Sequence, residues 1–292
     1  MIAIIANNIT IISSAVLTLI GSIGNTMSIF IMTKPKLLKD PFFRYMISAT
    51  IFDNFSIFFL WISPSFPSLG LNTVSLNCKM NIYFGFLVSH YGAWMNVLCS
   101  LDRYLSVKHP TKCKFRKKFK YQFLAILLVC LLVGLIDTPL AFYVDVSKNQ
   151  SSTNGCSARS NGVYLAGLGA LMETILPCLI MAVFTTMIGY ELIILKKKTT
   201  NKKHFTKEKK MLKTLSSVNI FFFITTSPYT LYMFILGVLN EEFYGTLNFT
   251  ILRNIYRIYP TFGFFVLFAS NTLFRNHFFS FFVCTKNLGL KF

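Results

Sequence analysis

The triplet Asp102-Arg103-Tyr104 lies at the end of a long apolar run and is the first candidate for chemistry in this sequence. An arginine at the edge of a membrane is costly unless it is paired or faces water. We therefore expect Arg103 to be held in an ion pair with Asp102. Its release would act as a switch and not as a catalytic step.

Other charged residues stand alone inside apolar runs. Asp53 is one, and burying a carboxylate without a partner costs several kcal/mol, so we take it as a candidate functional residue. Asp137, Glu173, Arg253 and Arg257 stand in comparable positions. Charges at such depth should pair with each other or line a cavity that holds water.

The composition is that of a membrane protein. Hydrophobic residues make up 54% and charged residues 13%, against roughly 45–50% and about 25% in soluble domains. About 20 apolar residues are needed to cross the bilayer, and they must be helical because lipid offers no hydrogen-bond partners. Seven runs meet this length, so residues 1–292 are predicted to form one all-helical, seven-transmembrane bundle with helices at about 9–32, 43–66, 77–104, 121–144, 162–195, 209–239 and 246–269.

The basic residues predict the orientation of this bundle. Lys and Arg total 29 against 10 Asp and Glu, and most of them fall in alternate segments between the runs and in the tail. Because basic loops stay in the cytoplasm, the amino terminus should be outside and the carboxyl terminus inside, in the plasma membrane. The partner of this charge is then the bilayer and not nucleic acid. No basic region or cleavage site precedes Ile9, so we interpret the first helix as a signal anchor.

Catalysis has little support. His90 and His109 are far apart, His204 and His277 fall on the cytoplasmic side, and no metal-ligand spacing appears. We expect no enzyme activity, no metal and no cofactor.

Two outer cysteines and two outer sequons fit this topology. Of seven cysteines, Cys78 and Cys156 lie in outer segments, where a disulfide can form, and we expect one between them. Asn149 and Asn248 begin sequons in outer segments and are candidate glycosylation sites.

Residues 100–110, from Asp102-Arg103-Tyr104 to His109-Pro110, resemble the end of helix three in rhodopsin-like G-protein-coupled receptors. The 25 residues from Cys78 to Arg103 match that family's spacing. The resemblance continues in Gly21-Ser22-Ile23-Gly24-Asn25, in Asp53, and in the helix prolines Pro139, Pro177 and Pro228.

The resemblance implies roles for these residues. Asp102, Arg103 and Tyr104 would form the coupling motif, and Glu208 would join Arg103 in an inactive-state latch, unless Glu208 is only solvated in its lysine-rich segment. Asn25 and Asp53 would form a buried polar core, where the family binds sodium. Residues 272–283 would form an amphipathic eighth helix, with Cys284 a palmitoylation candidate or an ordinary thiol.

Several family positions differ here. Helix four has no Trp, Thr226 replaces the Trp of helix six, and Thr185 replaces the Tyr of helix five. The Asn-Pro segment of helix seven becomes Gly263-Phe264, and Gly92 stands where helix three often supplies a hydroxyl. Asp53 thus loses usual partners, which calls the sodium site into question.

The ligand is predicted from what lines the outer half. Gly85 stands where amine receptors carry an Asp, which argues against a monoamine. Glu173 would bind a basic group of the ligand, and Arg253 or Arg257 would bind a carboxylate or carbonyl. Asp137 is the fourth candidate ligand-binding residue. The chain is similar to invertebrate FMRFamide-like neuropeptide receptors, so we expect an extracellular peptide ligand and a heterotrimeric G protein as partners. The alternatives are a chemosensory receptor of the same fold and a membrane transporter.

Overall fold

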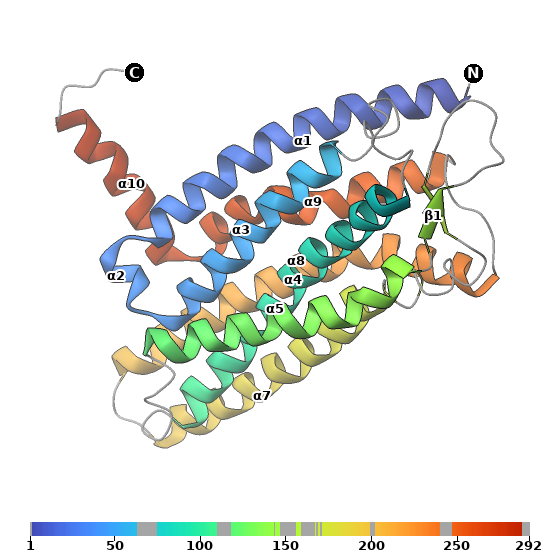
Figure 1. The fold of residues 1–292 in the computed structure, drawn as a ribbon. Helices are drawn as coiled ribbons and strands as arrows, with labels where there is room; N and C mark the ends of the chain where they lie inside the picture. Colours follow the sequence, from blue (N-terminus) through green and yellow to red (C-terminus); the bar gives the residue numbers. More distant parts are fainter. Residues whose placement is uncertain are drawn as a thin grey trace.

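The computed structural model describes residues 2–62, 75–109, 118–142, 144–146, 156–158, 167, 169, 171–198, 202–239 and 247–287. In this part of the chain, seven helices of 22 residues or more run the length of the molecule (Figure 1). They are α1 (Ile2–Met32), α3 (Pro41–Ile62), α4 (Ser75–Lys108), α5 (Phe119–Phe142), α7 (Leu176–Lys198), α8 (Lys202–Leu239) and α9 (Leu247–Ser270). The prediction of a helical bundle is confirmed.

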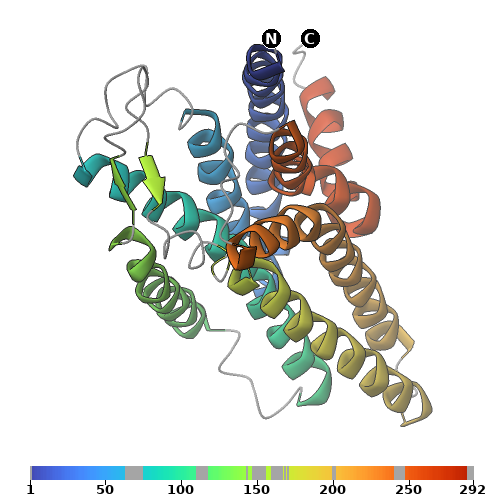
Figure 2. The ribbon, with the colours of Figure 1, turned by 90° about the vertical axis from the view of Figure 1, so that its right-hand side faces the viewer.

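The helices pack in a closed ring. α1 packs against α3 and α9, α3 against α4, α4 against α7, α7 against α8, and α8 against α9, while α5 packs on the outside of α4. Figure 2 views this ring from the end where the chain begins. α4 contacts more of these helices than α5 does, so side chains on α4 can reach most of the bundle.

Shorter elements complete the fold. α2 (Pro35–Leu38) turns the chain between α1 and α3, and a π-helical turn, η3 (Leu171–Ile175), leads into α7. β1 (Val144–Val146) and β2 (Cys156–Ala158) pair antiparallel near α4. α10 (Thr272–Asn287) leaves the bundle at the α2 end (Figure 1), and the Asn271 side chain caps its start by accepting the Phe274 N–H at 3.0 Å.

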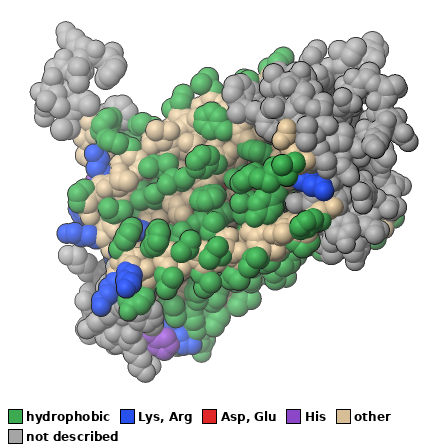
Figure 3. All heavy atoms as spheres, in the orientation of Figure 1, with side chains coloured by type: hydrophobic (Ala, Val, Ile, Leu, Met, Phe, Trp, Pro, Cys, Tyr) green, Lys and Arg blue, Asp and Glu red, His purple; other side chains and the backbone are tan. Residues whose placement is uncertain are grey.

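The outward faces of the helices are apolar. Four segments among the described residues are long and apolar enough to cross a membrane: Ile12–Met32, Phe119–Pro139, Leu171–Lys196 and Phe205–Leu236. On α5, Leu124, Leu128, Leu131 and Leu135 are all exposed, as lipid-facing residues are. Figure 3 shows apolar side chains along the flank and most of the visible Lys and Arg side chains at the α2 end.

Several helices carry buried polar residues, among them Thr50 of α3, Asn96 of α4 and Thr261 of α9. At the α2 end they close around a large apolar core. Leu37, Phe42, Phe43, Leu215 and Phe274 are almost fully buried there. We call this end, which also carries Lys34, Lys36, Lys39, Lys207 and Lys209, the basic end.

Some helix ends differ from those expected from hydropathy. α8 begins at Lys202, where a start near residue 209 was predicted, because its first two turns are lysine-rich and project beyond the apolar segment. The predicted start near residue 162 of the helix that holds Pro177 lies outside the described residues. α3 is described as far as Ile62, and its predicted end near residue 66 also lies outside the described residues.

Candidate functional site

Arg103 is held by two carboxylates at the basic end. Its guanidinium Nη2 lies 2.6 Å from Asp102 Oδ2 and 2.8 Å from Asp40 Oδ1. The side chain is 3% exposed, and the guanidinium stands over the Phe42 ring at 5.6 Å from its centroid. Removing one partner of a buried ion pair costs about 3–5 kcal/mol, so this arrangement fixes Arg103 firmly.

Asp40 connects this pair to α8. Its Oδ2 lies 3.1 Å from Lys207 Nζ, and its Oδ1 also accepts the Phe42 backbone N–H at 3.2 Å. Burial alone would raise the pKa of Asp40, but the charges of Arg103 and Lys207 outweigh it and hold the pKa below the ordinary value. Asp40 is therefore ionised at neutral pH and bridges α4 and α8.

Glu208 and Tyr104 flank this bridge. Glu208 is 5% exposed, follows Lys207 on α8, and lies close enough for its charge to act on Arg103. Tyr104 faces α7, where its ring tilts on Phe184 at 5.8 Å and its hydroxyl accepts from Lys108 Nζ at 2.5 Å. The predicted coupling residues thus gather at one end of the bundle, with Asp40 added.

A second group of polar residues lies in the middle of the bundle. Asn25 Nδ2 donates to the Pro260 carbonyl at 3.0 Å and so ties α1 to α9. The Asp53 carboxylate lies against Gly92 of α4, where a Cβ would come within 2.9 Å of Asp53 Oδ1. Beside it, Asn96 donates to the Tyr259 hydroxyl, so α9 still supplies a polar group although its Asn-Pro segment is altered.

Two carboxylates in the half of the bundle away from the basic end join a histidine. His90 Nδ1 lies 2.6 Å from Asp137 Oδ1, and His90 Nε2 lies 3.8 Å from Glu173 Oε2. The Tyr256 hydroxyl donates to Glu173 Oε1. Asp137 and Glu173, which were expected to line a cavity or pair with arginines, are therefore engaged in a buried cluster with His90.

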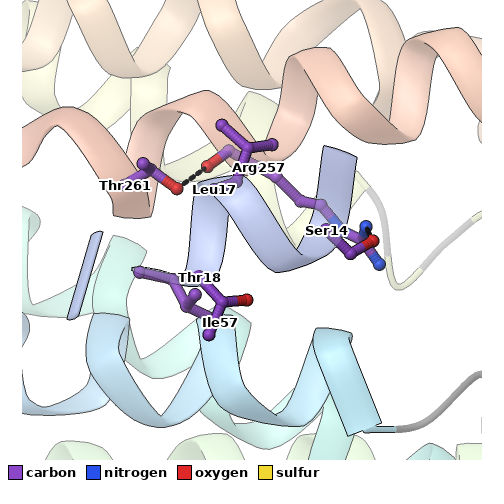
Figure 4. Close-up of a pocket in the computed structure, with 6 residues that line it drawn as sticks. All are labelled: Ser14, Leu17, Thr18, Ile57, Arg257 and Thr261. Carbon is purple, nitrogen blue, oxygen red and sulfur yellow. Dashed lines mark hydrogen bonds between the residues drawn. The ribbon is translucent and has the colours of Figure 1, made fainter. Parts of the chain in front are cut away.

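The two arginines of α9 have different surroundings. Arg253 lies over the Phe249 ring at 5.9 Å, whereas Arg257 is buried and donates from Nη1 to Ser14 Oγ of α1. Arg257 lines a small cavity with Ser14, Thr18 and Thr261 (Figure 4). The cavity has room for about one water-sized group, which is too little for a peptide.

Helices α7 and α8 carry the substituted family positions. Asn219 Nδ2 donates to Thr185 Oγ1 at 3.2 Å and so links the two helices, while Thr226 donates to the Phe222 carbonyl of its own helix. Pro139 lies inside α5 and Pro228 inside α8, as expected. The polar contact at Thr185 shows that the position keeps a link between helices after losing its Tyr.

Several predicted residues have side chains outside the described part. Cys78 falls in the first turn of α4 and Cys156 begins β2, but their side chains are not among those described. The same holds for Cys284 in α10, and Asn149 lies outside the described residues. Asn248 is exposed in the first turn of α9, where a sequon would be accessible.

Asp40 and His90 were missed by the sequence analysis. Asp40 is the single acidic residue among Lys34, Lys36, Lys39 and Arg44, and this lone opposite charge was the available signal. His90 stands 13 residues before Arg103 in the same helix, and it was considered only as a catalytic group. Its role depends on three other elements, which no local pattern reveals.

Comparisons with known proteins agree with this geometry. Residues 24–269 match the family "7 transmembrane receptor (rhodopsin family)". The chain is 22% identical over 231 residues to the type-1 angiotensin II receptors of Meleagris gallopavo and Gallus gallus. These matches cover 76% of this chain and 63% of each relative, so the chain spans less than two thirds of the length of these relatives.

The family is one of receptors and not of enzymes, so the prediction of a non-enzymatic, multi-pass membrane receptor is confirmed and the transporter alternative loses its support. The match covers most of the chain, and Arg103, Asn25 and Asp53 all fall within it. The chain therefore belongs to the rhodopsin family of seven-transmembrane receptors.

Proposed function

We propose that this receptor converts the binding of an extracellular peptide into activation of a cytoplasmic heterotrimeric G protein. The observation that carries the proposal is the bridge from Arg103 through Asp40 to Lys207, which connects α4 and α8 at the basic end. With the amino terminus outside, this end faces the cytoplasm, as its lysines favour.

The two halves of the bridge differ in strength. The Arg103–Asp102–Asp40 contacts are buried, whereas Lys207 is 51% exposed and its pair with Asp40 is worth only about 0.2–1 kcal/mol. The α8 link therefore breaks first. A ligand that prefers the open state by about 1–3 kcal/mol is sufficient to shift such an equilibrium.

Movement of α8 would then expose the receptor's contact for its partner. As Lys207 leaves Asp40, Glu208 on the same turn moves away from Arg103. Arg103, Asp102 and Tyr104 are left at the opening between α4 and α8, where a G protein would bind. In this scheme Glu208 and Lys207 act together as the α8 side of the latch.

The peptide ligand is supported from the opposite end. The relatives named above are receptors for angiotensin II, and the helix-seven run at Arg253 is similar to that of FMRFamide-like receptors. Arg253 is partly exposed one turn outside Tyr256, so it is placed to meet a peptide carboxylate or carbonyl. Asp137, Glu173 and Arg257 would act behind it, through the packing of their helices.

The remaining site proposals follow the same orientation. A Cys78–Cys156 disulfide would join the start of α4 to β2, and β1 already packs against α4. Asn149 and Asn248 would carry glycans and Cys284 a palmitoyl group at the inner leaflet. Sodium binding at Asp53 is not part of the proposal, because Gly92 faces the carboxylate where a second oxygen ligand would be needed.

The test is second-messenger output from cells that display the receptor. Calcium and cyclic AMP would be measured against a library of amidated peptides and small odorants, with Arg103→Ala at matched surface display as the control. We expect a saturable response to a peptide that Arg103→Ala abolishes. A response to odorants alone would assign the receptor to the chemosensory class, and a response that survives in Arg103→Ala would contradict the coupling role.

A further inference from the structure

A buried acid–base cluster crosses the bundle in the half away from the basic end. It joins His90 of α4, Asp137 of α5, Glu173 of η3 and Tyr256 of α9. The side chain of His90 is 2% exposed, and Asp137 and Glu173 are no more than 6% exposed. The imidazole ring thus contacts carboxylates from two other elements, and Tyr256 joins the cluster through Glu173.

The contacts of the ring set its proton count. Nδ1 lies 2.6 Å from Asp137 Oδ1 and Nε2 lies 3.8 Å from Glu173 Oε2, so each nitrogen faces a carboxylate oxygen. A neutral imidazole carries one N–H, which leaves a lone pair facing an oxygen on one side. A charged imidazolium presents N–H groups to both. The proton that makes the imidazole charged can also move to Glu173, and it then still belongs to the cluster.

Charge balance also favours the binding of one added proton to the cluster. Two ionised carboxylates beside a neutral imidazole would place two negative charges in an apolar interior, which is costly. One added proton reduces that charge by one. Among the described residues, His90 Nε2 and Asp137 Oδ2 are also buried without a hydrogen-bond partner, so the cluster has unused capacity for a proton.

The other groups around the ring are neutral. The Phe86 ring lies 5.5 Å from the imidazole, and the Gly169 backbone lies near it. Tyr256 of α9 contacts Glu173 and not the ring itself. On the far side of Tyr256, Tyr229 of α8 packs at 5.1 Å and Ser89 of α4 forms a hydrogen bond. The next charged group on α9, Arg257, points to Ser14 of α1. In the described part of the chain, Asp137 and Glu173 are thus the charges that face His90.

We propose that the His90, Asp137 and Glu173 cluster is a proton-binding site, and that the proton is a second ligand of this receptor. With the proton bound, both carboxylates are attached to α4 through His90. Without it, a lone pair faces a carboxylate and the link from α4 to α5 or η3 weakens. Proton occupancy and helix arrangement are then linked, so each changes the other.

The direction of the effect follows from this geometry. The protonated cluster stabilises the packed bundle, so this contribution is present at low pH and is lost as the pH rises and the proton leaves. That the proton comes from the extracellular side rests on the orientation given under the proposed function. The stability effect itself does not, because it needs neither ligand nor G protein.

The test is thermal unfolding of the purified full-length receptor in detergent. A thiol-reactive dye would report exposure of Cys99, Cys130 and Cys178, which are free cysteines inside the bundle. All variants would carry Asp53→Asn, which removes the carboxylate in the middle of the bundle as a further source of pH dependence. The melting temperature would be followed from about pH 5.5 to about pH 8.5.

We expect the melting temperature to fall by about 3 °C per pH unit over part of this range. His90→Gln should abolish most of that slope, while His277→Gln on α10 should leave it unchanged. The proposal would be overturned if the melting temperature of the receptor with His90 intact did not change with pH. It would also be overturned if His90→Gln left the slope of melting temperature against pH unchanged. If His90→Gln does not fold, Glu173→Gln and Asp137→Asn replace it: a smaller slope in both supports the site, and an unchanged slope in both contradicts it.

Discussion

Arg103 is held by two carboxylates, and only one of these two contacts can change when the helices move relative to each other. Asp102 is its neighbour on α4 and moves with it in any rigid shift of that helix. Asp40 comes from the turn before α3 and is also bound to Lys207 of α8. Only the Asp40 side therefore responds to movement between helices, so the switch depends on a residue outside the Asp-Arg-Tyr motif.

Replacing Lys207 should loosen α8 without disturbing Arg103. We expect Lys207→Gln to raise basal second-messenger output by about 1.4-fold to fivefold, because the pair it removes is worth about 0.2–1 kcal/mol. Lys210→Gln, an exposed lysine on the same helix, is the matched control and should leave basal output unchanged. Equal effects of the two variants would show that general charge loss on α8, and not the Asp40 pair, controls the output.

The lowered pKa of Asp40 predicts how the latch responds to acid. Its ionised form contributes fully above the ordinary pKa of 3.8 and is lost only as the pH falls through the lowered value. The ratio of basal G-protein nucleotide exchange in Asp40→Asn to that in the parent should therefore be constant from about pH 5.5 to 7.5. The ratio cancels effects from other titrating groups. A ratio that approaches one at the acid end of this range would contradict the assigned ionisation.

Sequence patterns predicted the residues that act within one segment. Arg103 and Asp102 were predicted because they are adjacent at the end of an apolar run, and Asn248 remains a prediction from a local sequon. Asp40 pairs with a residue 63 positions away and His90 with one 47 positions away. Such pairs arise from helix packing, so one sequence does not reveal them.

Among the elements, the lipid-facing helices were the easiest to predict. α5 has a long apolar segment with an exposed leucine face, so hydropathy alone identifies it. α9 is harder because Arg257 and Tyr259 are buried inside the ring. The π-helical start before α7 was not predicted, since hydropathy is the same for a π turn and an α turn. Its effect is to place Glu173 beside His90.

The close approach of α1 and α9 depends on a small residue. A Cβ at Gly21 would lie 2.6 Å from Ile57 Cδ1 and 3.1 Å from the Thr261 backbone Cα. The Ile57 side chain can move, but the α9 backbone can move only if the helices separate. We expect Gly21→Ala to lower the melting temperature by several degrees, consistent with overpacking costs of about 1–3 kcal/mol.

Gly189 on α7 is the control for this change. A Cβ at Gly189 would meet nothing within 4 Å. Gly189→Ala should therefore be neutral or raise the melting temperature, because Ala favours a helix by up to about 1 kcal/mol. Equal destabilisation by both substitutions would show that the α1–α9 contact is looser than described.

For the whole molecule, the two ends of the bundle carry different charge. The basic end holds the lysine-rich start of α8 and the Arg103 latch, and the opposite half holds the His90 cluster. Arg103 and His90 lie on the same helix, about 20 Å apart at the usual helical rise. α4 is thus the element through which a change at one end would reach the other.

This charge distribution predicts the orientation in the membrane. An epitope tag at the amino terminus should be stained on intact cells, and a tag at the carboxyl terminus only after permeabilisation, because basic segments remain in the cytoplasm. Asn248→Gln should also increase electrophoretic mobility if its exposed side chain carries a glycan. Staining of the carboxyl-terminal tag on intact cells would reverse the topology and remove the latch from the cytoplasmic side.

The most direct test of the receptor mechanism is nucleotide exchange on a heterotrimeric G protein. Membranes with equal surface amounts of the parent receptor, Asp40→Asn and Arg103→Ala would be compared without ligand. Asp40→Asn should raise exchange by about tenfold, the effect of weakening the closed state by about 1.4 kcal/mol, and Arg103→Ala should reduce it to the level of receptor-free membranes. Equal exchange by all three receptors would contradict the claim that Arg103, held by Asp40, controls signalling.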